Sequence, residues 1–402
     1  MKIAYLIPYF QPRMGYSEYY LLTELKRSGH DVCIITSDRR PPNEIIMNPS
    51  VNRRAMTGKF IEYGLTVYRL PTLYDFGIMT INYGLKIILD SFKPDIIHCA
   101  SLFSLSSFLP IIYKKKFRYK IFFNSLTGEF DPKGVENLYF NIYKRIFANY
   151  ISKNSNGFFA ICDGSKKWLS KHFAVPGSSI NIIPLGADNN LFVPNQKNRR
   201  LIRDNFGILD DEVLLIFAGR ITPGKDIDIL IKSMKLIIHD HSKKIKLMII
   251  GNGPQKYLKY LREYISLKNI DNNIIFVSTV DRIELPKYYN AADIAVWPGN
   301  PAISLIEAMS TALPIIICKY PEKREDAFDT CHLLEYENGL SFYRGDYVAL
   351  ANCIIKLICD KDLREKMGNN SRKLVNDKLN WVCIAHKTLK IYEEDKNTHL
   401  NC

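Results

Sequence analysis

The sequence predicts an α/β protein of two Rossmann-like, doubly wound domains that face each other across a cleft, followed by C-terminal helices. The chain has 402 residues, which at ~100–200 residues per domain is enough for two domains. Hydrophobic residues make up 47% of it, and glycines and prolines are scattered without a period, as in ordinary globular proteins. Short apolar runs alternate with amphipathic stretches in two successive series, which is typical of βαβ units around parallel sheets.

The first series occupies residues 1–190 and predicts the N-terminal domain. Its strands are expected near 3–8, 31–36, 96–99, 120–124, 157–161 and 181–184, and its helices near 17–28, 80–92, 135–153 and 164–173. Polar residues without periodicity follow at 191–200, and they predict a linker to the second domain.

The second series predicts a C-terminal domain at 201–375. Its strands are expected near 213–217, 246–251, 274–277, 294–297 and 314–318, and its helices near 226–239, 254–267, 284–291 and 304–311. Residues 345–395 contain no strand-like run and predict helices; the last part, 376–402, is expected to be a helix and tail, for which we consider packing back on the N-terminal domain. Ligands of such sheets bind at the carboxyl ends of the strands, so two facing domains predict a binding cleft.

Charge is concentrated in the first domain. Residues 1–190 carry 24 Lys and Arg against 14 Asp and Glu, whereas residues 191–402 carry 31 against 27. The excess favours an anionic partner, although a coding sequence rich in lysine codons would explain it equally. No recognisable nucleic-acid module appears, so we expect no nucleic-acid partner. The segments 114–120 and 166–168 place cations near aromatics; they could rest against an anionic membrane or form a solvated basic face.

The cysteines and the apolar runs indicate in which cellular compartment the protein is expected. Nine cysteines are dispersed without a CxxC or a Cys/His cluster, which predicts reduced thiols in a cytoplasmic protein and no metal site. The most apolar window, 102–113, is shorter than the ~18 residues of a membrane span, and the apolar run 3–10 reads as a first strand. We therefore expect a cytoplasmic protein whose membrane association, if any, is peripheral.

One anion site is predicted where the strand 213–217 ends. Gly219 and Arg220 follow that strand, and a short loop then delivers Lys225 to the start of the next helix. Two permanent cations beside helix amides suit a diphosphate whose charge grows as a bond breaks. The alternative is a surface loop with two solvated charges.

Two further loops follow strands of the same domain. Gly251, Gly253 and Pro254 open a helix and are predicted to contact the ligand bound at this edge, as is Gly219; ordinary turns also produce such a pattern. The third loop leads into the helix that carries Glu307, whose carboxylate could accept both hydroxyls of a ribose while loop amides hold phosphate. A glutamate that merely favours the helix dipole is the alternative. The loop and first helical turn comprise Gly299, Asn300, Ala302, Ile303, Ser304 and Leu305.

In this order and spacing the three loops, with Leu285 to Asp293 and Leu313-Pro314, resemble the family 4 glycosyltransferases, retaining enzymes of the two-Rossmann GT-B fold. The resemblance implies that Arg220 and Lys225 hold the diphosphate of a nucleotide sugar donor and stabilise the leaving nucleotide. It implies that the backbone from Asn300 to Leu305 cradles phosphate and that Glu307 binds the ribose. In the first domain, Gly15 and Tyr16 resemble the glycine-rich loop that faces the donor.

The sequence departs from the family pattern at several positions. A single glycine, Gly15, stands where a pair is usual, and Gly299 stands where a glutamate eight positions before Glu307 is usual. The histidine that often follows the strand 120–124 is missing; Glu129 or Asp131 could take over its sugar contacts or be solvated loop acids. His98, at another strand end, is expected to be structural.

The resemblance implies a metal-independent, retaining hexosyltransferase that needs no cofactor besides its donor, a UDP- or GDP-sugar. The acceptor would be a glycan or a polyprenol-linked saccharide in surface polysaccharide or glycolipid synthesis. Retention would follow a front-face route in which the leaving phosphate oxygen deprotonates the acceptor. Gly299 and the missing histidine keep an alternative open, a catalytically silent GT-B homologue that binds a sugar nucleotide or glycan as a partner subunit.

Overall fold

The computed structural model describes residues 1–12, 15–41, 52–76, 79–102, 104–125, 135–240, 244–300, 302–320 and 331–394. These residues form two compact units. The first contains Met1–Pro184 together with the C-terminal residues from Ile384, and the second contains the described residues from Leu185 to Cys383.

The first unit is built on a sheet with strand order β10-β9-β8-β7-β1-β2-β4-β3. All its neighbouring strands pair in parallel except β3 and β4, which form an antiparallel hairpin at one edge. A separate antiparallel pair, β5 and β6, follows β4 in the chain. The strands are β1 (Lys2–Leu6), β2 (Asp31–Ser37), β3 (Gly58–Glu62), β4 (Leu65–Leu70), β5 (Thr72–Phe76), β6 (Met79–Asn82), β7 (Ile96–Cys99), β8 (Lys120–Ser125), β9 (Gly157–Ala160) and β10 (Ile180–Ile182).

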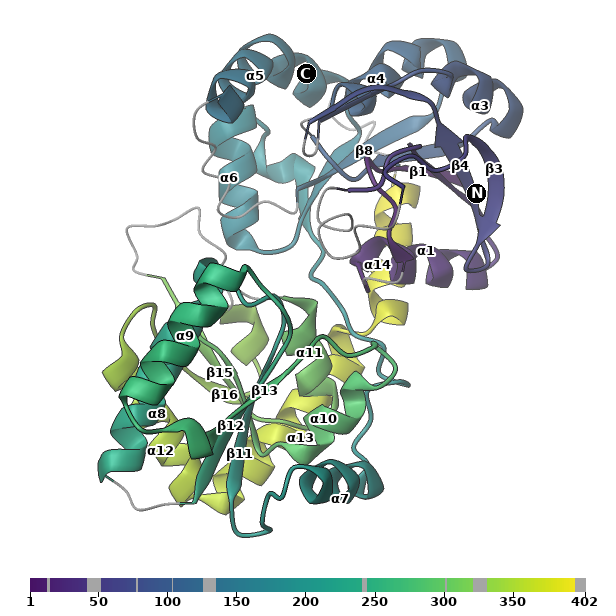
Figure 1. The fold of residues 1–402 in the computed structure, drawn as a ribbon. Coiled ribbons are helices and arrows are strands. Elements are labelled where there is room, and N and C mark those ends of the chain that lie inside the picture. The colour runs from purple at the N-terminus through teal and green to yellow at the C-terminus, as the bar shows by residue number, and fades with distance from the viewer. Residues whose placement is uncertain are drawn as a thin grey trace. The chain divides into compact units, whose positions relative to one another are not determined.

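Helices cover both faces of this sheet, with α3, α4 and α5 along one face and α1 and α14 on the other (Figure 1). Because successive side chains of a strand point to opposite faces, Ile97 and Cys99 join the core under α3 to α6, whereas His98 points to α14. There its Nδ1 is hydrogen-bonded to the hydroxyl of the buried Tyr392. The helices are α1 (Ser17–Arg27), α3 (Leu85–Phe92), α4 (Leu105–Phe117), α5 (Val135–Asn154), α6 (Asp163–Phe173) and α14 (Trp381–Glu393).

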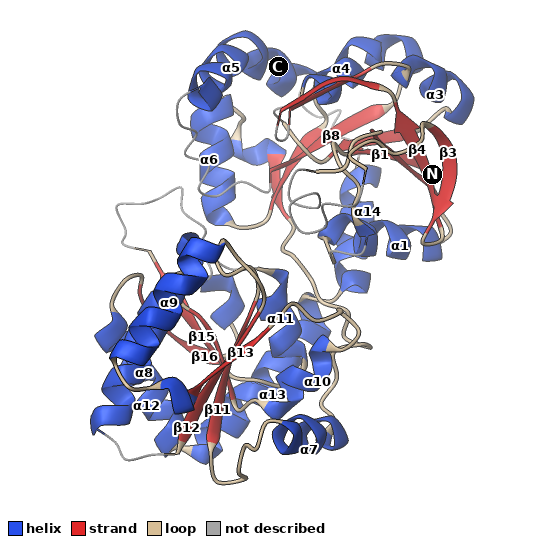
Figure 2. Ribbon diagram, in the orientation of Figure 1, coloured by secondary structure: helices blue, strands red, loops and turns tan. Residues whose placement is uncertain are grey.

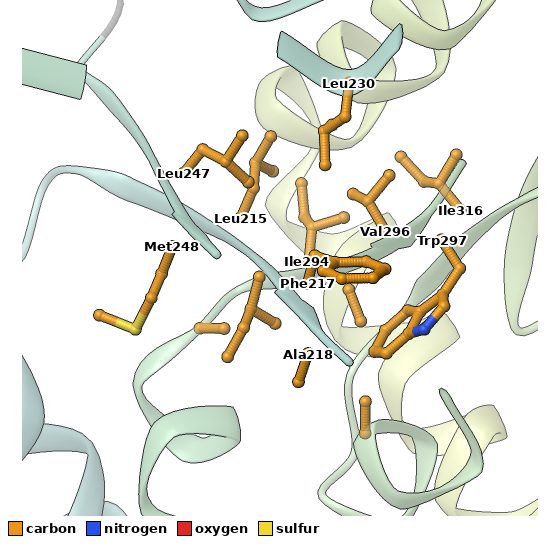
Figure 3. Close-up of a cluster of buried hydrophobic side chains, with 14 of the residues drawn as sticks. Leu215, Phe217, Ala218, Leu230, Leu247, Met248, Ile294, Val296, Trp297 and Ile316 are labelled. Atoms are coloured by element: carbon orange, nitrogen blue, oxygen red, sulfur yellow. The ribbon is translucent and has the colours of Figure 1, made fainter. Parts of the chain in front are cut away.

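The second unit contains a parallel sheet of order β13-β12-β11-β14-β15-β16 with helices on both faces (Figure 2). Its central strands are apolar throughout, as expected where both faces are covered, and Phe217, Leu247 and Trp297 lie in its core (Figure 3). The strands are β11 (Val213–Ala218), β12 (Ile245–Ile250), β13 (Ile274–Val277), β14 (Ile294–Trp297), β15 (Ile315–Lys319) and β16 (Gly339–Tyr343). The helices are α7 (Gln196–Asn205), α8 (Ile227–Asp240), α9 (Gln255–Leu267), α10 (Leu285–Ala291), α11 (Ile303–Ser310), α12 (Tyr347–Cys359) and α13 (Lys361–Lys378).

Both predicted βαβ series are confirmed, but the strands β3 to β6 and β16 and the helices α4 and α7 were not predicted. The hairpin β3–β4 turns through Tyr63 and Gly64, both with positive φ (51° and 80°), as a two-residue hairpin of alternating strands requires. The predicted helix at 80–92 begins only at Leu85, because β6 occupies its first residues. The edge strand β16 was not predicted because its sequence, Gly339-Leu-Ser-Phe-Tyr, is not a continuous apolar run.

The boundary between the units also differs from the expected one. It falls after Pro184, and the residues predicted as a linker, 191–200, lie in the second unit. There Asn195 caps α7 by accepting the backbone N–H of Asn198 at 3.1 Å. The second half of the polar run 191–200 forms the first part of α7, in which Ile202 and Arg203 are buried. In the described part of the chain, no helix has the length and apolar character that a bilayer crossing requires.

Candidate functional site

The three loops singled out in the sequence leave β12, β11 and β14, which are neighbours in the sheet of the second unit. Since the strands are parallel, their carboxyl ends lie at one edge and bring the loops together. Hydrogen bonds continue beyond the strands: Gly219 N–H donates to Ile250 O at 3.0 Å, and Ile221 N–H donates to Asn252 O at 2.9 Å. The candidate site is built on this edge.

The glycines of these loops allow backbone to meet backbone. A Cβ on Gly251 would lie 1.9 Å from Gly219 O, and one on Gly253 would lie 1.8 Å from Ile221 O, so neither position tolerates a side chain. Pro254 follows as the N-terminal flanking residue of α9. This packing accounts for Gly251 and Gly253 with or without a ligand, and their contact with a donor stays a prediction.

Gly299 is explained in the same way. A Cβ there would lie 2.6 Å from Gly224 O and 2.8 Å from the Cα of Lys225. The turn Pro223–Lys225 therefore occupies the space that a glutamate side chain at 299 would need. The glycine at position 299, where the family usually has a glutamate, is thus explained by the close approach of this turn to the loop after β14.

Lys225 is held by that loop. Its Nζ donates to the carbonyl oxygen of Asn300 at 2.8 Å, and Asn300 N–H in turn donates to Gly224 O at 3.3 Å. Burial lowers the pKa of Lys225 to about 8, and the positive charge of the exposed Arg220 contributes in the same direction. An anion placed here would oppose both effects because it stabilises the charged form of Lys225, so the electrostatics of this edge favour negative charge.

The helix α11 points its amino end to the same edge. The hydroxyl of Ser304 donates to Ala218 O at 2.7 Å, which ties the first turn of α11 to the end of β11. A Cβ on Gly219 would lie 3.9 Å from the Ser304 oxygen, so the two loops are adjacent. Ala302 flanks the helix in extended conformation, and Ile303, Ser304 and Leu305 form its first turn. The backbone amides of a first helical turn and the positive end of the helix dipole favour phosphate.

Glu307 lies one turn further along α11 and is 1% exposed. Its carboxylate forms an ion pair with the guanidinium of Arg282, which comes from the loop after β13 and lies 5.3 Å from the ring centre of the buried Phe192. Burial raises the pKa of Glu307 to about 7, against the opposing influence of Arg282. If Glu307 contacts the ribose as predicted, it does so with a carboxylate that is positioned by its ion pair with Arg282.

Sequence reasoning missed Arg282 and also Arg344, which joins the same edge. Arg344 pairs with Asp226 (2.5 Å from Nε to Oδ2) and donates to the hydroxyl of Tyr320 at 2.9 Å. Tyr320 in turn bonds the side chain of Asn300. Arg344 follows β16, so recognising that strand would have predicted its place. Its network fixes the loops after β11 and β14 to each other.

The first unit contains the remaining predicted residues, Gly15 and Tyr16. Gly15 has a positive φ of 71° and precedes α1, whose N-terminal flanking residue, Tyr16, is 39% exposed. Glu18, which was not singled out, is buried in the first turn of α1, and burial raises its pKa to about 7.

His98 is fully buried between Tyr392 and Phe159 with its pKa lowered to about 4 by desolvation, in keeping with a structural role. Glu129 and Asp131 lie outside the described residues.

A metal centre and a separate cavity are the other candidate binding features of the described residues. No group of three or more His, Cys, Asp or Glu is arranged there to hold a metal ion. A cavity of about 340 Å³ lies in the second unit beside α7 and α10, lined in part by Arg199 and Asn290. The Arg199 guanidinium already bonds Ala291 O, Ala292 O and Asp293. None of the predicted site residues lines this cavity.

Comparison with known families matches both halves of the chain. A family model described as glycosyl transferases group 1 matches residues 198–374, and one described as glycosyltransferase family 4 matches residues 15–191. Among curated relatives, the capsular polysaccharide biosynthesis glycosyltransferase CapM of Staphylococcus aureus is 28% identical over 54% of this chain and 55% of its own length. An uncharacterized glycosyltransferase of Methanocaldococcus jannaschii is 28% identical over 57% of each chain. These alignments thus span little more than half of either relative.

Other similarities cover nearly the whole chain. D-inositol 3-phosphate glycosyltransferase of Corynebacterium glutamicum is 24% identical over 96% of this chain and 94% of its own. Among solved structures, sucrose-phosphate synthase of Thermosynechococcus elongatus has a TM-score of 0.75 at 19% identity and covers 98% of both chains. Anabaena Alr3699/HepE in complex with UDP also has a TM-score of 0.75, at 16% identity, over 97% of this chain and 99% of that one. At such identities, structural likeness establishes the fold alone.

Proposed function

Because the chain belongs to the family 4 glycosyltransferases and has their GT-B fold of two Rossmann-like domains, we propose that it transfers a sugar from a nucleoside diphosphate sugar to a glycan or polyprenol-linked acceptor. The observation that carries this proposal is the convergence of Lys225, Arg220 and the amino end of α11 at one sheet edge. A diphosphate leaving group needs this combination of charge and amide donors.

The donor's diphosphate would lie against Arg220, Lys225 and the first turn of α11, with its ribose near Glu307. As the bond between the sugar C1 and the phosphate oxygen breaks, negative charge grows on the leaving diphosphate, and the two cations stabilise it. This arrangement would work without a metal ion. Named relatives support the donor class: the HepE structures contain UDP and UDP-glucose, and these compounds guide the choice of ligands to test.

Retention of the sugar's configuration would follow a front-face route. The acceptor hydroxyl attacks C1 from the side that the diphosphate leaves, the C1–O bond to the acceptor forms, and the acceptor proton moves to the leaving phosphate oxygen. This route requires no protein nucleophile and no carboxylate at position 299. We further propose that the transferred sugar is a hexose and that the product is a surface polysaccharide or a glycolipid. The name of the relative CapM, a capsular polysaccharide biosynthesis glycosyltransferase, supports this class of product.

Gly299 favours one alternative, a catalytically silent homologue that binds a sugar nucleotide as a partner subunit. The close approach of Gly224 and Lys225 leaves no room for an acidic side chain at that position. Such a protein would bind the nucleotide through the same cations and would release no sugar.

Titration calorimetry with UDP, GDP and ADP tests the donor site, first on the unmodified protein and then on Arg220→Ala and Glu307→Ala. We expect one nucleotide to bind and both substitutions to weaken it. Lys259→Gln, on the exposed face of α9, is the matched control for lost charge. If no nucleotide binds at millimolar concentration, the donor site is refuted. If binding occurs but the matching nucleotide sugars are neither hydrolysed nor transferred, the silent homologue is the correct description.

A further inference from the structure

Two charged features of the structure have no part in the proposed function. In the first unit, the basic segments 114–120 and 166–168 are partly internal, because Lys114 donates hydrogen bonds to neighbouring residues and Trp168 is 2% exposed. These segments therefore do not form the exposed surface that the sequence suggested. In the second unit, a network of hydrogen bonds around Arg344 encloses one of the proposed donor-binding cations.

Arg344 belongs to the same sheet edge as the candidate site. It follows the strand β16, which runs parallel to β15, and its backbone N–H still bonds to the end of β15. A guanidinium group carries five N–H groups in one plane. In Arg344, Nε donates to Asp226 Oδ2 at 2.5 Å, and Nη2 donates to Asp226 Oδ1 at 3.4 Å and to Gly224 O at 3.3 Å. Nη1 donates to the hydroxyl of Tyr320 at 2.9 Å and to Asn300 Oδ1 at 3.4 Å. All N–H groups of this guanidinium are thus bonded within the second unit.

The acceptors of Arg344 surround one residue of the chain. Gly224 precedes Lys225 and Asp226 follows it, so the guanidinium bonds to the backbone on one side of the lysine and to a side chain on the other. Asn300 is the residue whose carbonyl oxygen accepts Lys225 Nζ at 2.8 Å, and Arg344 bonds to the side chain of that same residue. A single side chain therefore fixes both the turn that carries Lys225 and the group on which its ammonium rests.

The ion pair between Arg344 and Asp226 also holds the turn in a conformation that it would not favour alone. Asp226 follows the turn Pro223–Lys225 with a φ of 52°, in the left-handed region that few residues with a Cβ adopt. Both side chains are largely buried, with 21% and 17% exposed, so water and salt screen the pair less than one on the surface. Two N–H groups that face two carboxylate oxygens also fix the direction of approach. Loss of Arg344 would free this turn, and Lys225 with it.

Because its N–H groups are all bonded, Arg344 differs from the cations that would bind the sugar donor. A phosphate could reach its guanidinium only by displacing one of its present partners, whereas Arg220 is exposed at the same edge. The network also depends on Gly299, because a Cβ there would lie 2.6 Å from Gly224 O, which accepts Arg344 Nη2. Any contribution of Arg344 to the reaction would therefore be made through Lys225.

We propose that Arg344 is a positioning residue for the transfer reaction, which holds Lys225 in place for the diphosphate of the donor through the bonds described above. The proposal deepens the proposed function and rests on it, because Lys225 acts there on the leaving diphosphate. Without Arg344 the lysine would keep its charge, but its turn would shift. A displacement of about 1 Å at a reacting group is enough to lower a rate by about 10²-fold.

A double-mutant cycle in donor hydrolysis tests the proposal. UDP-glucose, GDP-mannose and ADP-glucose are the probes, and released nucleotide is measured for the unmodified protein, Lys225→Ala, Arg344→Gln and the double variant. We expect Arg344→Gln to lower kcat by about 10- to 100-fold while KM changes by less than about threefold. Since Arg344 acts through Lys225, the double variant should be no slower than Lys225→Ala alone.

Three further variants separate positioning from folding. Arg344→Lys keeps the charge but has one nitrogen, which cannot bond to both loops, so it should restore little of the lost kcat. Tyr320→Phe removes one hydroxyl from the network and should lower kcat by a smaller factor; it replaces Arg344→Gln if that variant does not fold. Arg364→Gln is the matched control, because Arg364 donates to Leu357 O at 2.5 Å and to Ile358 O at 2.9 Å outside the site. Its loss should lower the melting temperature, followed by circular dichroism, and leave kcat unchanged.

Three results overturn the proposal: an Arg344→Gln variant with unchanged kcat, a loss confined to KM, or losses of the two single variants that multiply in the double variant. The last result would show that Arg344 acts independently of Lys225. In all three, the unmodified protein still releases nucleotide and Lys225→Ala still slows the release, so the proposed function stands.

Failure of the proposed function has a different signature, in which the unmodified protein releases no nucleotide from any probe. The same four proteins are then compared by calorimetry with UDP, GDP and ADP. If a nucleotide binds, Arg344→Gln should weaken its binding when Lys225 is present and have no effect in the Lys225→Ala background; losses that multiply overturn the proposal. If no nucleotide binds, the proposal fails together with the donor site.

Discussion

Replacement of Arg282 by glutamine should change how nucleotide affinity depends on pH. Arg282 and Glu307 form a pair in which the carboxylate side chain is 2% exposed and the guanidinium side chain 19%. If the ribose hydroxyls require an ionised acceptor, binding is linked to loss of the Glu307 proton. Affinity must then fall as pH decreases through about 7, the pKa of Glu307.

The alkaline limit comes from Lys225. Its pKa of about 8 means that the cation facing the diphosphate is lost as pH rises through that value. Nucleotide affinity should therefore follow a bell-shaped profile with its maximum between about 7 and about 8. Arg282 sets the position of the acidic limb, since the other groups that interact with Glu307, Asp188 and Tyr289, do not stabilise its charge.

The magnitude follows from the geometry. At an effective dielectric constant of ~20, opposite charges ~4 Å apart attract by about 4 kcal/mol, which corresponds to about three pKa units. Even if relaxation and water cancel most of this, the pKa of Glu307 in Arg282→Gln should rise by a unit or more. At pH 7 the ionised fraction would fall from about one half to below about one tenth, so affinity should drop at least about fivefold.

Calorimetric titration of the matching nucleotide from pH 6 to 9 measures the effect. The terminal phosphate of the nucleotide titrates equally with both proteins, so the difference between their profiles isolates Glu307. Arg282→Lys should restore part of the affinity near pH 7, because it keeps a positive charge. Superimposable profiles for the unmodified protein and Arg282→Gln would refute the reasoning, as would an unmodified protein whose affinity is flat between pH 6 and 8.

Three further predictions concern single positions. Lys225→Ala should lower the turnover of donor hydrolysis by about 10²–10³, measured as released nucleotide, and a change below twofold would exclude Lys225 from stabilising the leaving group. Gly299→Ala should displace the turn at Gly224 and lower both the melting temperature and nucleotide affinity, whereas Gly177→Ala, whose added Cβ would lie 3.8 Å from its nearest side-chain neighbour, should be nearly neutral in the same assays. Glu18 has a pKa raised from 4.5 to about 7, so the stability it contributes is present below 4.5 and is lost as pH rises to about 7, by about 3 kcal/mol. Denaturant unfolding at pH 5 and 8 should show a smaller loss for Glu18→Gln, and an unchanged loss would contradict the assignment.

The strand-to-loop organisation of both units was predictable because apolar runs and helical periodicity are local signals. Lys225 illustrates this success: knowing that a strand precedes it and a helix follows was enough to place it at the carboxyl edge of the sheet. The GT-B fold is confirmed by the structural similarities. Donor contacts of the individual loop residues remain predictions.

Contacts made across the sheet were not predictable from local patterns. Arg344 lies 118 residues from its partner Asp226 and follows a weakly apolar edge strand. Arg282 precedes α10 in a loop whose sequence has no feature that reveals a partner in α11. The sequence also does not show that Gly251 and Gly253 pack against the backbone of Gly219 and Ile221.

The helix α14 also constrains how the polypeptide must be made. It starts in the second unit and from Ile384 onward belongs to the first, where Tyr392 O accepts Lys120 Nζ at 3.1 Å. A ribosome that has released residues 1–184 has therefore not yet synthesised the helix that covers Phe122 and His98. The first unit therefore cannot complete its fold until nearly the whole chain has been synthesised. Until then, the aromatic side chains that α14 covers on this face of the sheet remain exposed to solvent. A nonsense mutation before codon 384 would thus remove the part of α14 that completes the first unit. The truncated protein would be bound by chaperones or degraded by proteases, and its N-terminal domain would not fold on its own.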